Sequence, residues 1–191
     1  MNTLPPIILA SKSPRRQELL KMTGIDFRVV LKEVDESFPD GLQPAEVAVY
    51  IAEKKAHAFD ETLQENEIVL TADTIVCIDG KILGKPADAS EAFEMLSLLA
   101  GRKHEVVTGV AFLQNHQLTS FAEVTEVYML PLTESEINHY IQNYMPFDKA
   151  GAYGIQEWIG LAGIERINGS YSNVVGLPTH RVYQELGKLN V

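Results

Sequence analysis

Asp73 and Lys85 are residues whose types and positions could support hydrolysis. A carboxylate near a lysine recurs in hydrolytic sites, because the carboxylate activates water or holds a metal ion while the ammonium neutralises phosphate. The two residues flank one predicted hairpin, which could bring them close together. An unpaired charge in an apolar β run is costly. Asp73 therefore either has such a role or lies at a bulge or strand end, bonded to backbone N–H groups.

Two adjacent arginines, Arg15 and Arg16, fall in the first turn of a predicted helix. Ser13 suits the N-cap of that helix and Pro14 its first position. Cations at this end oppose the helix dipole by roughly 0.3–1 kcal/mol each. A phosphate chain bound by the helix N–H groups, the guanidiniums and the hydroxyls of Ser11 and Ser13 would offset that cost. Alternatively, both arginines point into water or pair with acidic side chains elsewhere.

Three further charged residues could join such a site. Asp35 and Glu36 lie side by side in a polar segment, where they either hold a divalent ion together with Asp73 or are simply solvated. Lys55 lies near the middle of a predicted amphipathic helix, where a lysine is usually a surface charge. Together with the two arginines and Lys85, it could neutralise a triphosphate.

Gln156 is a candidate for recognising a nucleobase. Its amide both donates and accepts hydrogen bonds, and uracil and thymine present an N3–H group flanked by carbonyl oxygens. One bidentate contact could read that edge. The alternative is an ordinary surface glutamine.

Composition limits the functional classes. The chain has 191 residues, of which 46% are hydrophobic and 22% charged, as in a soluble globular domain with a substantial core. Its net charge of −10 argues against general adhesion to nucleic acid or acidic membranes. The single cysteine, Cys77, excludes an intrachain disulfide and is typical of a reducing cytosol. We find no signal peptide or membrane span, so we expect a cytoplasmic protein.

The order of predicted elements indicates an α/β fold. A strand over 7–10, a helix over 14–22 and a strand over 27–31 open the chain. The remaining predictions are a helix beginning at Pro44, two β runs around 71–74 with a turn at 79–80, a helix from 88 that ends at Gly101, a long hairpin about 115–116, a helix after Thr133, a loop or broken helix over 148–156, a short hairpin near 168–169 and a final helix after Pro178. No repeat or flexible linker interrupts the chain, so we predict one folding unit over residues 1–191.

Six stretches of the chain occur in the order typical of one enzyme family. They are LASKSPRRQELL, EVDE, TADTIVCIDGKILGKP, GRKHEVVTGV, DKAGAYGIQ and GSYSNVVGLP. The chain resembles the Maf family of nucleoside triphosphate pyrophosphatases nearly from end to end. This resemblance implies a single Maf-like domain with a mixed, twisted sheet, flanking helices and two lobes around a central cleft. Such a fold is similar to that of the inosine-triphosphate pyrophosphatases, and the family often forms homodimers.

The resemblance also implies an activity. The family cleaves a nucleoside triphosphate between its α and β phosphates, giving the monophosphate and pyrophosphate, with a divalent cation that is usually Mg²⁺, with Mn²⁺ as the alternative. By this resemblance Asp73 is the expected proton acceptor. The matching positions are Arg16, Lys55 and Lys85 for phosphate contacts, Asp35 and Glu36 with Asp73 for the metal, and Arg15, Thr74 and Gln156 for substrate choice.

The substrate-choice residues resemble the branch that acts on dTTP and UTP, and the branch that acts on 7-methyl-GTP differs at them. Position 35 departs from some relatives, because Asp35 stands where they have Glu. Two alternatives remain open: a pyrophosphatase for modified or non-canonical nucleotides, and a nucleotide-binding regulator of septum formation. In each case we expect a small-molecule nucleotide as the partner, with no nucleic acid or membrane.

Overall fold

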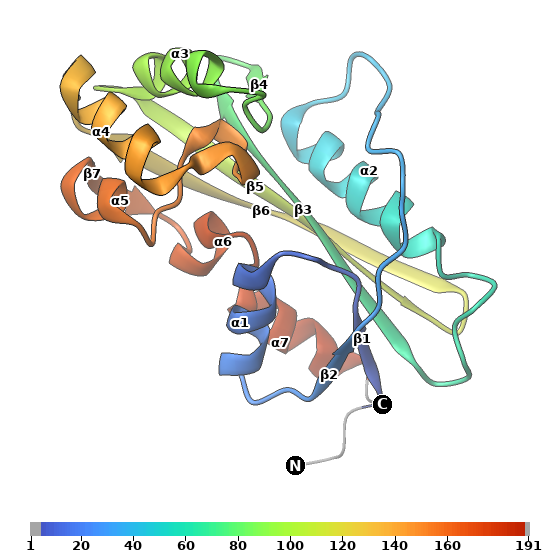
Figure 1. Ribbon diagram of the computed structural model, residues 1–191. Coiled ribbons are helices and arrows are strands. Elements are labelled where there is room, and N and C mark those ends of the chain that lie inside the picture. Colours follow the sequence, from blue (N-terminus) through green and yellow to red (C-terminus); the bar gives the residue numbers. More distant parts are fainter. Residues whose placement is uncertain (1–4, 190–191) are drawn as a thin grey trace. The chain divides into compact units, whose positions relative to one another are not determined.

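The computed structural model describes residues 5–189, and the chain divides into two compact units (Figure 1). Unit 1 takes its described residues from Met1–Asp73, Thr108–Glu123 and Gly176–Val191, and unit 2 consists of Thr74–Val107 and Val124–Val175. Three strands contribute residues to both units: β3 (Ile68–Ile78), β5 (Lys103–Gln114) and β6 (Gln117–Met129). That both units fold together as one domain stays a prediction.

Unit 1 is an α/β arrangement. Its strands follow the order β2-β1-β3-β5-β6, and β1 (Ile7–Leu9) pairs in parallel with both β2 (Phe27–Val29) and β3. Parallel neighbours need a crossover connection, usually a helix. Helix α1 (Pro14–Met22) connects β1 to β2, as the opening of the sequence predicts. The predicted mixed α/β class is confirmed.

Helices cover both faces of the unit 1 strands. Successive strand residues point to opposite faces, so Leu9 packs in a cluster with Leu20 of α1 and Val182 of α7 (Thr179–Lys188). Ile8 belongs to the other cluster, with Ala52 of α2 (Pro44–His57). Figure 1 shows α1 and α7 together and α2 apart from them. The buried faces of α1 and α2 therefore pack against opposite faces of β1.

A glycine in β5 sets how closely α2 approaches the strands. A Cβ atom added to Gly109 would lie 2.2 Å from the backbone carbonyl carbon of Ala48 in α2, far inside van der Waals contact. Glycine in a strand interior often marks such a close approach of another backbone. Gly109 therefore helps to fix the position of α2, which carries Lys55.

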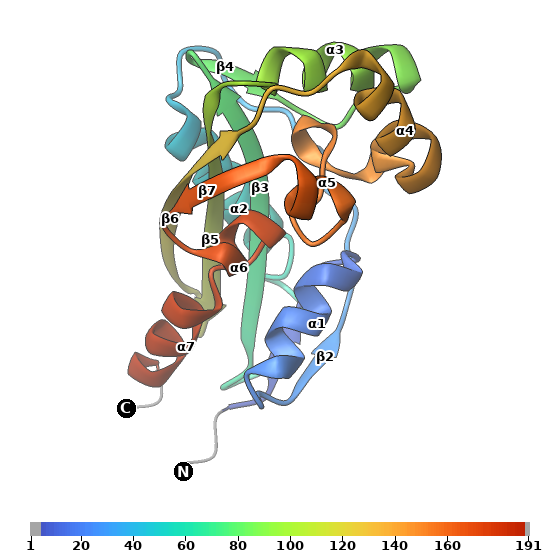
Figure 2. The same ribbon diagram turned by 90° about the vertical axis from the view of Figure 1, so that its left-hand side faces the viewer.

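Unit 2 packs helices against antiparallel strands. Strand β4 (Lys81–Leu83) pairs with β3, and β7 (Ile164–Asn168) pairs with β6. Its core contains buried residues from strands and helices alike. Figure 2 shows its helices, which are α3 (Ala89–Leu99), α4 (Glu134–Tyr144), α5 (Trp158–Ala162) and α6 (Tyr171–Val175), with short 3-10 turns at Pro146–Asp148 and Ala150–Ala152. None of the helices in residues 5–189 is long and apolar enough to cross a membrane.

The predicted starts of α3 and α4 are confirmed, but one predicted hairpin is wrong. Asp88 accepts a hydrogen bond from the backbone N–H of Glu91 at 2.9 Å, as its spacing indicates. The hairpin expected near 168–169 does not form, because β7 pairs with β6 and the chain after Gly169 enters α6. Ser170 stabilises this helix by accepting the backbone N–H of Asn173 at 3.3 Å.

Candidate active site

An ammonium group lies between two carboxylates in unit 1. Lys55 Nζ of α2 is 2.7 Å from Asp73 Oδ1 on β3 and 2.9 Å from Glu36 Oε1 in the segment before α2. The side chains of Lys55 and Asp73 are 16% and 13% exposed, whereas that of Glu36 is 52% exposed. The pair thus lies at the edge of the core, where charge interactions are stronger than in open water.

The ion pair with Lys55 explains why a charged residue, Asp73, can lie in an apolar strand. Its neighbour Ala72 is buried, and a lone charge at such a position would be costly. The structure pairs this carboxylate with a cation, and the role of Asp73 in hydrolysis stays a prediction. The partner is Lys55 of α2, not a residue of the hairpin itself.

Arg16 ties the start of α1 to the same region. Its Nε donates to the Gly176 carbonyl and its Nη1 to the Ala72 carbonyl, both at 2.8 Å. Burial lowers the pKa of the Arg16 guanidinium, and the neighbouring Asp73 carboxylate opposes that shift. The two carbonyl groups and the nearby carboxylate offset the unfavourable interaction between the Arg16 charge and the helix dipole. Direct contact of Arg16 with a phosphate stays a prediction.

The chain entering α1 is held by its serines. Ser13 is the N-cap and accepts the Arg16 backbone N–H at 3.5 Å, while buried Ser11 accepts the Ser13 N–H at 3.2 Å. Arg15 is partly buried in the same turn, and its charge contributes to lowering the pKa of Arg16. The two arginines are thus close enough to act on one anion.

The acidic pair at 35 and 36 separates in the structure. Asp35 accepts hydrogen bonds from the Ser37 hydroxyl and from the Lys54 ammonium at 3.2 Å, which lower its pKa to about 2. Glu36 instead pairs with Lys55. Within residues 5–189 no three acidic, histidine or cysteine side chains are gathered closely enough to hold a metal ion. The joint role of Asp35, Glu36 and Asp73 as metal ligands stays a prediction.

The other predicted site residues belong to unit 2. Thr74 directly follows Asp73 in β3, Lys85 is exposed in the loop after β4, and Gln156 is exposed in a turn before α5. That these three residues act on the same substrate as the residues of unit 1 stays a prediction.

Comparison with known proteins identifies the family. The model of the Maf family, described as Maf-like protein, matches residues 6–189. The chain belongs to the Maf family. A protein of Flavobacterium psychrophilum named dTTP/UTP pyrophosphatase is 51% identical over 177 residues, covering 93% of this chain and 91% of that protein. One of the same name from Bacteroides fragilis is 49% identical over 184 residues, covering 96% and 95%. The structure of the Staphylococcus aureus Ham1 protein matches with a TM-score of 0.48 and 16% identity, covering 65% of this chain and 71% of that one. The family predicted from the sequence is confirmed.

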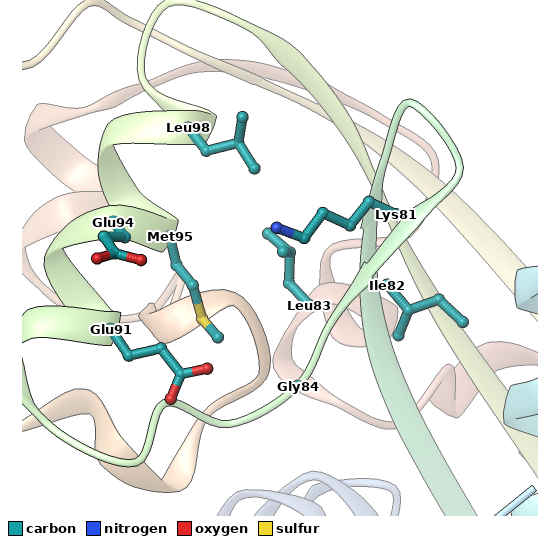
Figure 3. A pocket seen from close by; sticks show the side chains of 8 residues that line it. All are labelled: Lys81, Ile82, Leu83, Gly84, Glu91, Glu94, Met95 and Leu98. Atoms are coloured by element: carbon teal, nitrogen blue, oxygen red, sulfur yellow. The ribbon is translucent and has the colours of Figure 1, made fainter.

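A separate pocket in this Maf protein lies between β4 and α3. Figure 3 shows its lining, with Lys81 on the strand side and Glu91 and Glu94 on the helix side, and with the apolar side chains of Met95 and Leu98 on the same helix. Its volume of about 170 Å³ is below the roughly 300–1,000 Å³ of typical ligand pockets. It contains none of the predicted site residues, so we do not assign the nucleotide to it.

Three polar residues of this Maf protein form a cluster that no sequence motif indicates. Tyr140, Lys149 and Glu157 form a hydrogen-bonded cluster beside the turn that carries Gln156. Tyr140 lies on the buried face of α4, and its spacing from the apolar residues of that helix is typical of a core residue. The only signal was the glycine-rich stretch 148–156, which indicates close backbone packing without revealing its polar partners.

Proposed function

We propose that this protein hydrolyses nucleoside triphosphates, with dTTP and UTP as its substrates, to the monophosphate and pyrophosphate. The observation that carries the proposal is the Lys55 ammonium between Asp73 and Glu36, beside the cationic start of α1. Support for the substrates comes from the names of the two Maf relatives, which are about half identical over nearly the whole chain.

In this reaction a water oxygen bonds to the α-phosphorus, and the bond from that phosphorus to the α–β bridging oxygen breaks. Pyrophosphate leaves with the bridging oxygen. Asp73 accepts the proton of the attacking water, and Lys55 holds the Asp73 carboxylate in place at 2.7 Å. Arg16, which donates hydrogen bonds to the carbonyls of Gly176 and Ala72, supplies a fixed positive charge near Asp73.

The donor set fits a divalent cation such as Mg²⁺, with Mn²⁺ as the alternative. Mg²⁺ is usually bound by one or two carboxylates together with substrate phosphates. Glu36 and Asp73 already contact one cationic group, the Lys55 ammonium, so these two carboxylates would be the protein ligands of the divalent cation. Asp35 would reach the divalent cation only if it were released from Lys54. When bound, the cation would neutralise charge on the phosphates.

Phosphate binding in this proposal falls to cations at a helix start and to lysines. The start of α1, with the Ser11 hydroxyl and the guanidiniums of Arg15 and Arg16, forms a surface suited to an anion. Lys55 and Lys85 would add positive charge. A chain with a net charge of −10 needs such a local cationic site to attract a triphosphate.

Base selection in this proposal rests on Gln156, with Arg15 and Thr74 as further residues of substrate choice. The Gln156 side chain is exposed on a turn, so its amide is available to a base. We place the protein in the cytoplasm, where these nucleotides occur, and retain the homodimer as a prediction. Modified pyrimidine nucleotides are the second candidate substrates, because an edge like that of uracil is all that the amide reads.

The substrate prediction can be tested by pyrophosphate release from dTTP, UTP, CTP, dATP, GTP, modified pyrimidine triphosphates and 7-methyl-GTP. We expect turnover of dTTP and UTP to exceed that of the purine nucleotides at least about tenfold, since one bidentate contact contributes about 1–3 kcal/mol. Chelation of divalent cations should abolish it. Turnover confined to other nucleotides would contradict the substrate assignment, and tight binding without turnover would support a regulator.

A further inference from the structure

The turn that presents Gln156 has both of its ends bonded to one hydroxyl group. The Glu157 backbone N–H donates to the Gly154 carbonyl at 3.0 Å, which closes a four-residue turn. The Gly154 N–H donates to the Tyr140 hydroxyl oxygen at 3.0 Å, and that hydroxyl donates to Glu157 Oε2. Tyr140 therefore joins the first and last residues of the turn.

The hydroxyl is part of a longer chain of polar groups that runs from the core to the surface. Glu157 Oε1 is 3.1 Å from Lys149 Nζ, which also contacts Asp148 at 2.8 Å. Tyr140 is fully buried and the Lys149 side chain is 8% exposed. Burial and the Glu157 carboxylate raise the pKa of Tyr140, so its hydroxyl remains a donor at neutral pH. Such a chain holds its members firmly, because any group that lost its partner would be left unsatisfied.

The amide of Gln156, although exposed, lies close to the backbone of Gly154. A Cβ atom added to Gly154 would lie 2.8 Å from Gln156 Nε2 and 3.1 Å from the Glu157 carboxyl carbon. The Gln156 amide and the Glu157 carboxylate therefore lie against the same side of Gly154. A carboxylate on that side attracts the NH₂ end of the amide and repels its oxygen.

Orientation of the amide matters for chemistry. Uracil and thymine donate from N3 and accept at O4, whereas cytosine accepts at N3 and donates from N4. A glutamine amide that rotates by half a turn serves both patterns equally. Discrimination between them requires that the amide be held in one orientation before the base arrives.

We propose that Tyr140 is a positioning residue for base selection. Its hydroxyl, supported by Glu157 and Lys149, fixes the 154–157 turn so that Gln156 offers its amide to the base in one orientation. This inference rests on the proposed base-reading role of Gln156. It goes further by naming the groups that make this glutamine selective.

Tyr140→Phe removes the hydroxyl alone. We expect the ratio of kcat/KM for dTTP to that for dCTP to fall about tenfold, mainly through a higher KM for dTTP, while kcat for dTTP changes less than about twofold. Tyr144→Phe is the matched control, since it removes an exposed hydroxyl from the same helix and should keep the wild-type ratio. Assays are run well below the melting temperature of each variant.

A purely structural role for Tyr140 would lower stability or affect both nucleotides equally, and an unchanged ratio in Tyr140→Phe would therefore overturn the proposal. Gly154→Ala tests it independently if Tyr140→Phe folds poorly. Its added methyl would lie 2.8 Å from Gln156 Nε2 and 3.1 Å from side-chain atoms of Glu157 and Lys149, all of them ends of flexible side chains rather than backbone, so the variant should fold, displace the amide and show the same fall in the ratio. An unchanged ratio there counts equally against the proposal.

Gln156→Ala separates this inference from the function on which it rests. If that variant loses the preference for dTTP while Tyr140→Phe keeps it, only the positioning role is wrong. If Gln156→Ala keeps the preference, base reading by Gln156 is wrong, and the role of Tyr140 falls with it.

Discussion

Asp73→Asn is expected to lower kcat on dTTP by about 10²–10⁴-fold, the range for loss of a general base. The amide cannot accept the proton of the attacking water, yet it keeps the shape of the side chain and can still accept a hydrogen bond from Lys55. Binding of a non-hydrolysable dTTP analogue should weaken less than about tenfold. Steady-state kinetics together with a binding titration measure the two effects separately.

The same substitution at Asp26 is the control for Asp73. Asp26 is exposed in the segment between α1 and β2, so Asp26→Asn should keep wild-type kcat. If Asp73→Asn retained kcat within about threefold of the wild type, Asp73 would not be the proton acceptor. A parallel loss of binding and turnover would indicate that Asp73 acts only by holding the nucleotide and its cation and not as the proton acceptor.

Lys55→Ala is expected to lower kcat/KM on dTTP by about 10²–10³-fold. Removal of one preorganised hydrogen-bond donor from an active site typically has an effect of this size. The substitution leaves the carboxylates of Asp73 and Glu36 without the cation that lies 2.7 and 2.9 Å from them. It also removes a positive charge from the proposed phosphate site. Initial rates over a range of dTTP concentrations give the size of the loss.

Lys54 provides a matched control one residue away on the same helix. Its ammonium is 3.2 Å from the exposed Asp35, an ion pair of a kind that contributes little. We expect Lys54→Ala to change kcat/KM by less than about threefold. Equal losses of kcat/KM in Lys54→Ala and Lys55→Ala would mean that general attraction of the anionic substrate, rather than the position of Lys55, explains the lower activity.

Local signals in the sequence were sufficient for most of the fold. Ser13 and Pro14 mark the start of α1, and Asp88 with Glu91 marks that of α3, because a cap requires only neighbouring residues. Strand partners are less accessible. The pattern around Gly169 suggests a hairpin, yet β7 takes its partner from β6, which is distant in the sequence.

The candidate site was predictable in its residues but not in its contacts. The lone charge of Asp73 in an apolar strand indicated either a role in hydrolysis beside Lys85 or a strand end bonded to backbone N–H groups. The lysine that contacts it is Lys55, which lies on a helix 18 residues earlier. That contact depends on the approach of α2 permitted by Gly109. The contact between Arg16 and the Gly176 carbonyl spans 160 residues, so local reasoning could not reveal it. The resemblance to the Maf family implied roles for residues, such as Gln156, for which the physical patterns alone left two interpretations open.

Hydrolysis of dTTP in water labelled with oxygen-18, with mass analysis of both products, tests the central claim most directly. Attack of water on the α-phosphorus predicts that the label enters dTMP and that the pyrophosphate carries none. Label in the pyrophosphate would mean attack at the β-phosphorus. Formation of dTDP with labelled phosphate would mean attack at the γ-phosphorus, and either result would contradict the proposed reaction.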